Sequence, residues 1–221
     1  MDGSRIDEFE APLTVRVART MDDVQRIAVV RALVYMREQD CPYEEEFDGN
    51  DLAGATHLIA EAGKEPLGCL RLRWFNGFAK VERVCVRDGH RSGKVARKLM
   101  AEAVEVIRRK GYTRFIGQVQ AHLVPYWKRY GFIHRADRGV FVFSDRAYAE
   151  MEAQCDPHPD ALTPEADPLV LDRPEGAWDE PGPLDRSVDR GACPAQLRDR
   201  ADERSTKPEQ KAPAETEETA S

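Results

Sequence analysis

The chain has 221 residues, of which 41% are hydrophobic and 33% charged, and its formal net charge is −7. No stretch approaches the roughly 18 consecutive apolar residues of a membrane-spanning helix, which excludes an integral membrane protein. Residues 1–12 lack the apolar core of a secretory signal. The five cysteines show no Cys-x-x-Cys spacing, which argues against a disulfide framework or a structural zinc site. We therefore expect a cytoplasmic protein.

The first elements combine a strand and a helix. Residues 13–18 alternate apolar and polar side chains, which is typical of an edge strand. Thr20-Met-Asp-Asp23 has the pattern of a helix capping box. The residues that then recur at helical spacing are Val24, Ile27, Arg31 and Val34. A polar, acid-rich loop follows at residues 40–54.

Three strand-like stretches come next, at residues 57–61, 68–75 and 80–87. In the second stretch the alternation places two leucines and Trp74 on one face and Arg71 and Arg73 on the other. One face of this strand is therefore expected to meet a core, and the other to carry charge.

The second half alternates helices and strands. A helix is expected from Ser92, with apolar residues on one stripe, cations in its last turn and Gly111 just after its end. A strand at 115–120, a short helix at 123–130 and a final strand at 140–143 follow. This order predicts a single α/β (α+β) domain over residues 1–155.

The composition changes after Cys155. Residues 156–221 contain 17 acids and 8 bases, ten of the 14 prolines, and Trp178 as their only aromatic residue. Such a segment has too little apolar surface to offset its chain entropy. We expect a disordered acidic tail that acts as a spacer, or alternatively carries a docking segment at residues 169–178.

Residues 84–96 form a strand, then a turn of small and basic residues, then the start of a helix. Free backbone N–H groups at a helix start, together with the helix dipole, bind phosphate. Arg91 and Lys94 add positive charge there. The alternative interpretation is a purely structural turn.

Two segments together resemble the GCN5-related N-acetyltransferase (GNAT) superfamily. Arg91-Ser-Gly-Lys-Val-Ala96 is similar to its acyl-CoA loop, Arg/Gln-x-x-Gly/Ala-x-Gly/Ala, and departs from it at Lys94. The stretch 122–132 ends in Gly-Phe, as the last helix of the family commonly does. Residues 31–58 resemble the ElaA-like branch, and their arginine and acids also resemble autoinducer synthases. The resemblance covers roughly residues 13–146.

The resemblance implies a mixed, mostly antiparallel sheet, flanked by helices and splayed between the strands at 80–87 and 115–120. Acetyl-CoA would lie in this gap, with its thioester against the backbone of Val84 and Val86. Its pyrophosphate would contact the N–H groups of the loop residues Arg91, Ser92, Gly93, Lys94, Val95 and Ala96.

The implied reaction is the attack of a neutral amine on the thioester carbonyl, which needs a base for the amine proton. Glu82 is the candidate base, because it shares a strand face with Val84 and Val86 and burial would raise its pKa. The alternative is an ion pair between Glu82 and Arg71 or Arg73.

The leaving thiolate needs an acid, and here the sequence departs from the family. Trp127 stands where the family usually has a tyrosine, and an indole N–H does not protonate a thiolate. Tyr126 is the candidate acid, with Tyr130, His122 or water as alternatives.

The resemblance also places five residues on the acceptor side, where acids suit a cationic amine and arginines a carboxylate: Arg31, Tyr35, Asp48, Asp51 and Arg71. The alternative is a salt-bridge network that orders the acidic loop. The histidines lack metal-ligand spacing and the globular part lacks a basic stripe, so we expect neither a metal nor nucleic acid.

The predicted function is acetyl transfer from acetyl-CoA to a small-molecule amine or an amino-acid-like acceptor. Two alternatives stay open. One is a long-chain acyltransferase related to autoinducer synthases, and the other is a non-catalytic acyl-CoA-binding or interaction protein.

Overall fold

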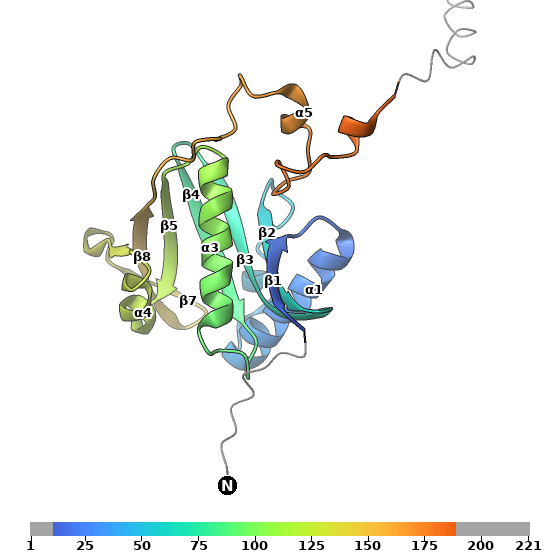
Figure 1. The fold of residues 1–221 in the computed structure, drawn as a ribbon. Coiled ribbons are helices and arrows are strands. Elements are labelled where there is room, and N and C mark those ends of the chain that lie inside the picture. The colour runs from blue at the N-terminus through green and yellow to red at the C-terminus, as the bar shows by residue number, and fades with distance from the viewer. Residues whose placement is uncertain (1–10, 189–221) are drawn as a thin grey trace, which may run out of the picture. The chain divides into compact units, whose positions relative to one another are not determined.

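A computed structural model describes residues 11–188 of the chain. These residues form a mixed sheet with helices on both faces (Figure 1). The strands are β1 (Leu13–Val17), β2 (Thr56–Ala62), β3 (Glu65–Phe75), β4 (Phe78–Val86), β5 (Arg114–Gln120), β6 (Ile133–His134), β7 (Val140–Phe143) and β8 (Arg146–Gln154). The α-helices are α1 (Met21–Arg31), α2 (Tyr43–Glu46), α3 (Lys94–Arg109), α4 (Val124–Lys128) and α5 (Pro168–Leu171). The π-helix η1 spans Ala32–Arg37, and the 3-10 turns are η2 (Ala121–Leu123), η3 (Ala136–Arg138) and η4 (Leu184–Arg186).

The sheet opens in its middle. Its strand order is β1-β2-β3-β4-β5-β8-β6, with β7 also paired to β8. All pairs are antiparallel except β4 with β5, which run parallel and pair only over Ala79–Val81 and Phe115–Gly117. Beyond Val81 the two strands separate. The predicted mixed, mostly antiparallel and splayed sheet is therefore confirmed.

The register of β4 is irregular where the strands separate. Its pairing with β3 shifts between Glu82 and Cys85, and Arg83 takes a φ of +52°, which is rare for a residue with a side chain. Such a bulge re-aims the residues beside it. At the opening, β4 therefore has an irregular edge, and its hydrogen-bonding pattern is interrupted.

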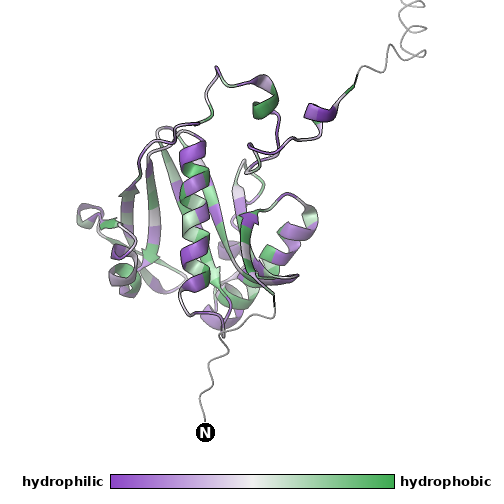
Figure 2. Cartoon of the chain, in the orientation of Figure 1, coloured by the Kyte–Doolittle hydropathy of each residue, from purple (hydrophilic) through white to green (hydrophobic). Residues whose placement is uncertain are grey.

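The two faces of the sheet carry separate apolar clusters. Helix α3 packs on one face, where Val95, Leu99, Ala103 and Ile107 are all buried, as their predicted stripe requires. Figure 2 shows hydrophilic and hydrophobic residues alternating along this helix. Helix α1 covers the other face, and its cluster is Ile27, Val30, Val34, Ile59, Cys69 and Cys85. On β3, Leu70 and Leu72 face the α3 side, as predicted.

Glycine allows α3 to approach the sheet closely. A Cβ atom at Gly68 of β3 would lie 2.8 Å from the carbonyl oxygen of Cys85 and 3.1 Å from a methyl of Val95. This contact places the start of α3 directly beside the end of β4, which is where the predicted phosphate loop lies.

The start of α1 confirms the predicted capping box. The Thr20 side chain accepts a hydrogen bond from the Asp23 N–H (3.1 Å), and the Asp23 carboxylate accepts one from the Thr20 N–H (3.1 Å). The helix continues as the π-helix η1, which brings Tyr35 to the opening of the sheet. Irregular turns of this kind are frequent at functional sites.

Two elements differ from the sequence interpretation. The predicted acid-rich loop contains the short helix α2. The strand at 140–143 is not the last, because β8 follows and its residues 148–154 pair with the whole of β5. Alanine, glutamate and glutamine in β8 have weak strand preference, so its conformation is imposed by the neighbouring strand.

Residues 156–184 also differ from the expected disordered tail that begins at Asp156. They belong to the compact unit that ends at Leu184, and Trp178 is buried. A Cβ at Gly176 (φ +75°) would come within 2.4 Å of the Val17 side chain. The remaining residues 189–221 of the predicted tail lie outside the described residues. The composition of residues 156–184 predicts disorder, but the buried Trp178 and the close approach of Gly176 to Val17 hold them against the domain.

The C-terminal end of α3 also holds this segment. The Arg109 guanidinium donates to the Asp179 carboxylate (2.5 Å), and the Arg109 carbonyl oxygen accepts from the Leu162 N–H (2.8 Å). Among residues 11–188, no helix is long and apolar enough to cross a membrane.

Candidate active site

Three adjoining cavities follow the opening between β4 and β5. The acceptor-side cavity has a volume of about 450 Å³, the central cavity about 150 Å³ and the loop-side cavity about 490 Å³. Gln39 lines all three, and Glu82 lines the acceptor-side and central cavities. The Gln120 side chain on β5 donates to the Gln39 side chain (2.7 Å), which bridges the opening.

The loop-side cavity unites most of the predicted acyl-CoA residues. Those that line it are Val84, Val86, Arg91, Ser92, Gly93, Ala96 and Tyr126. Two of the predicted residues do not line this cavity. The Val95 side chain is buried between α3 and the sheet, and the Lys94 side chain is exposed on the first turn of α3. Their backbone N–H groups nevertheless belong to this helix start, which is where the predicted contribution of both residues lies.

The start of α3 suits an anion. Gly93 caps the helix with a φ of +86° and has no side chain to accept the first N–H groups. Arg91 is held nearby, since its Nε donates to the Val86 carbonyl (2.8 Å) and its guanidinium pairs with Glu38. The arrangement presents backbone donors and a cation to the same cavity.

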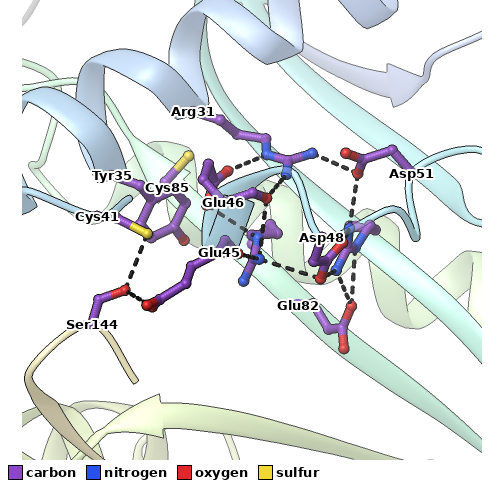
Figure 3. A network of polar contacts seen from close by, with 12 residues as sticks. Arg31, Tyr35, Cys41, Glu45, Glu46, Asp48, Asp51, Glu82, Cys85 and Ser144 are labelled. Atoms are coloured by element: carbon purple, nitrogen blue, oxygen red, sulfur yellow. Dashed lines mark hydrogen bonds and ion pairs between the residues drawn. The ribbon is translucent and has the colours of Figure 1, made fainter. Parts of the chain in front are cut away.

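A network of ion pairs lies behind the acceptor-side cavity (Figure 3). The Arg31 guanidinium donates to Glu46 (2.5 Å) and Asp51 (2.6 Å), and Arg31 and Glu46 are almost fully buried. Arg71, 1% exposed, donates to Asp48 (2.7 Å), Asp51 (2.9 Å) and Glu82 (2.7 Å). Each buried charge therefore has partners, as a low-dielectric site requires.

The five residues predicted on the acceptor side divide into two groups. Tyr35 and Asp48 line the acceptor-side cavity, and the Tyr35 hydroxyl donates to the Val84 carbonyl (3.0 Å). Arg31, Asp51 and Arg71 do not line it, because they occupy the network behind its wall. For these three, the geometry matches the alternative of a network that orders the acidic loop.

The expectation of a raised pKa for Glu82 is wrong. Burial opposes ionisation of this carboxyl, but a hydrogen bond and the charge of Lys80 (2.7 Å), with the Arg71 pair, outweigh burial and lower its pKa. Arg73 adds a third cation at 3.8 Å. Glu82 is therefore a carboxylate at neutral pH, and the ion pair given as the alternative is present.

Tyr126 and Trp127 occupy different environments. Burial and the hydrogen bond with the Tyr130 hydroxyl (3.1 Å) raise the pKa of Tyr126 to about 12. This phenol lies beside the loop-side cavity and keeps its proton at neutral pH. Trp127 is 7% exposed and packs edge-on against Phe132, and it also lines the central and loop-side cavities.

Sequence reasoning missed several groups at the site. Glu46 and Arg83 complete the network, with their side chains 3.2 Å apart, and the β7–β8 hairpin supplies one wall of the acceptor-side cavity. Arg83 and Lys80 lie within a predicted strand, where alternation gives their face but not their partners. Within residues 11–188, no group of three or more His, Cys, Asp or Glu side chains has an arrangement that could hold a metal ion.

Known proteins share both the sequence pattern and the fold. The model of the Acetyltransferase (GNAT) family matches residues 22–132. The chain is 31% identical to the uncharacterized N-acetyltransferase YjcF of Bacillus subtilis, over 52% of this chain and 82% of that protein. It is 29% identical to protein ElaA of Escherichia coli, over 47% of this chain and 71% of that protein.

A solved structure of an acyl-CoA N-acyltransferase from Pseudomonas aeruginosa superposes with a TM-score of 0.58 and 29% identity, over 64% of this chain and 98% of that one. The opening between β4 and β5 and the start of α3 both lie within the residues that the family model matches. The chain therefore belongs to the Acetyltransferase (GNAT) family, as an acyl-CoA N-acetyltransferase.

Proposed function

We propose that the chain transfers the acetyl group of acetyl-CoA to the amine of a small-molecule or amino-acid-like acceptor by direct attack. The observation that carries this proposal is the order of the three cavities. The loop-side cavity adjoins the helix start that suits a pyrophosphate, the acceptor-side cavity holds charged side chains, and the central cavity joins them between β4 and β5.

The reaction has one bond formed and one broken. The neutral amine nitrogen attacks the thioester carbonyl carbon, the new C–N amide bond forms, and the C–S bond breaks. The amine gives up a proton, and the CoA thiolate takes one to leave as the free thiol. The backbone of Val84 and Val86, which line the loop-side cavity, would hold the thioester at the edge of β4.

Glu82 is our candidate for the group that receives the amine proton. Among the described residues, it is the only carboxylate that lines both the acceptor-side and the central cavity. Its lowered pKa keeps it ionised and ready to accept a proton, although a weak base. Tyr126 is our candidate for the thiolate's proton donor, because its protonated hydroxyl lies beside the loop-side cavity.

Calorimetric titration of acetyl-CoA and of a long-chain acyl-CoA into the full chain tests the donor side. We expect micromolar affinity for acetyl-CoA and its loss in Lys94→Glu, which places a negative charge at the start of α3. The matched control is Lys64→Glu, on the exposed β2–β3 turn. Stronger binding of the long-chain donor would instead favour the long-chain transferase, and no binding of either would overturn the proposal.

The transfer itself is tested by following CoA release with a panel of amines. Release that depends on the amine supports the proposal. Donor binding with no amine-dependent release would instead favour a non-catalytic acyl-CoA-binding protein.

A further inference from the structure

The β7–β8 hairpin forms the wall of the acceptor-side cavity opposite the acidic loop. It contributes Val142, Phe143, Ser144, Arg146 and Tyr148 to the lining. It contacts the acidic loop through the Ser144 hydroxyl, which lies at hydrogen-bond distance from the Glu45 carboxylate and from the Cys41 sulfur (3.2 Å). Arg146 is the hairpin's only charged side chain in this lining.

Arg146 differs from the other cations of the cavity. Arg73 and Lys80 both pair with Glu82 (3.8 and 2.7 Å), and Arg83 pairs with Glu46 (3.2 Å). Among the described residues, Arg146 has no carboxylate within ion-pair distance. Its guanidinium donates one long hydrogen bond, from Nη2 to the Gln39 carbonyl (3.4 Å).

One donor of Arg146 is also buried without an acceptor. Its Nε lies out of contact with solvent and makes no hydrogen bond to a described residue. A buried, unsatisfied N–H of a charged group is costly, and arginine cannot lose its charge to avoid that cost. A bound anion that accepts from the other two nitrogens, Nη1 and Nη2, would give Arg146 the charge partner that it lacks among the described residues.

The planar guanidinium fork matches a carboxylate, which accepts two parallel hydrogen bonds. A phosphate fits this cavity less well, because its second negative charge would meet the four acids of the lining, Glu45, Glu46, Asp48 and Glu82. The charges of the cavity thus favour an occupant with a single carboxylate.

We propose that Arg146 binds a carboxylate of the acceptor, so that the substrate is an amino acid or a close analogue and not a simple amine. The carboxylate lies at the hairpin wall, and the amine points to Glu82 and the opening between β4 and β5. This inference rests on the proposed acetyl transfer, for which it names the class of acceptor and the residue that selects it.

The test measures kcat/KM for CoA release by the full chain with matched acceptors. Each of the twenty amino acids is compared with its carboxamide, which keeps the amine and removes the negative charge. For the amino acid that reacts fastest, we expect a preference over its carboxamide of about 10- to 100-fold, the usual range for a charged hydrogen-bond pair. Arg146→Gln should abolish the preference by raising the acceptor KM, with the affinity for acetyl-CoA unchanged.

Two further variants separate this role from a structural one. Arg146→Lys keeps the charge and should restore part of the preference. Arg138→Gln removes an arginine that pairs with Glu150 outside the cavity lining, and should leave the preference intact.

The outcomes are distinguishable from those of the proposed function. Equal use of amino acids and carboxamides, or a preference that survives Arg146→Gln, overturns this inference while acetyl transfer stands. Acetyl-CoA binding without transfer to any amine overturns both.

Discussion

Single side chains at the opening of the sheet decide which proton steps the site supports. Glu82 has its two oxygens on Lys80 and Arg71 (each 2.7 Å), which lowers its pKa despite its burial. A group with a lowered pKa does not titrate near neutrality. We therefore expect a rise of the rate between pH 6 and 9 to come from loss of a proton by the acceptor amine and not by Glu82.

Glu82→Gln is expected to lower kcat by about 100-fold, the lower range for removal of a general base. The pH at which kcat/KM reaches half its maximum should be the same in wild type and variant. The reason is that this pH dependence reflects deprotonation of the acceptor amine. Steady-state rates at a series of pH values measure both effects. Glu105→Gln, on the exposed side of α3, is the control.

If the rate of wild type rises with pH near pH 7 and this rise is absent in Glu82→Gln, the rise belongs to Glu82. That result would contradict the lowered pKa of Glu82. Because Arg71 loses a partner in this variant, near-ultraviolet circular dichroism must confirm that it is folded.

Tyr126→Phe tests the proton donor. It removes the hydroxyl and keeps the ring, so we expect kcat to fall by about 10- to 100-fold with little change in the affinity for acetyl-CoA. Tyr130→Phe, which removes only the hydrogen-bond partner, is the comparison. It should lower the pKa of Tyr126 and keep most activity. Equal losses in both variants would show that the hydrogen bond between the two hydroxyls, and not proton donation by Tyr126, supports activity.

At the scale of elements, α1 begins where two reciprocal hydrogen bonds fix Thr20 and Asp23. Thr20→Ala removes one of them and should lower the free energy of unfolding by about 1 kcal/mol. Urea denaturation measures this change, and Thr20→Ser keeps the oxygen and should match wild type. A loss equal in both variants would mean that the threonine methyl, and not the cap, stabilises the helix.

Elements with strong local signals could be predicted from the sequence. The capping box of α1, the apolar stripe of α3 and the two faces of β3 each depend on neighbouring residues in the chain. The β8 strand could not be predicted, because β5 imposes its conformation. The predicted phosphate loop is a local pattern that the sequence alone can suggest, whereas the partners of Arg71 come from two distant segments, the acidic loop and β4.

The same distinction explains what was missed around Arg146 and Trp178. The sequence around each residue gives no signal of its role, which depends on the distant residues that lie against it. A raised pKa for Glu82 is the general expectation for a buried carboxyl. Only the three-dimensional positions of Lys80 and Arg71 reverse it.

At the scale of the whole compact unit, the segment 156–184 is part of the fold and not an appendage. Trp178→Ala removes its buried aromatic anchor and should lower the free energy of unfolding by about 3 kcal/mol. Leu171→Ala, on the same segment but 46% exposed, should change it by less than about 0.5 kcal/mol. Urea midpoints compare the two. Equal free energies of unfolding for the two variants would mean that this segment is a spacer that does not stabilise the fold.

Stability should also depend on pH through carboxylates whose pKa is lowered in the folded state. Each of them stabilises the fold above its unfolded pKa of about 4, and that stabilisation is lost as the pH falls below about 5. These groups are Asp23, Asp48, Asp51, Glu82 and Glu152. Glu46 and Glu102 have the opposite sign, because burial raises their pKa values, so two carboxylates oppose five.

We therefore expect the melting temperature to fall by on the order of 10 °C between pH 7 and pH 3. Calorimetry across this range measures the fall. A melting temperature that stays constant would contradict the charged state of the network.

The acceptor-side wall and the donor-side loop come from separate parts of the chain. The β7–β8 hairpin lines only the acceptor end with its residues 142–146, while the start of α3 lines only the donor end. Changes in the hairpin can therefore alter which molecule is acetylated while the grip on acetyl-CoA stays the same. This separation makes the hairpin a natural target for libraries that seek new acceptors, and it gives related chains a route to diverge in substrate without rebuilding their donor site.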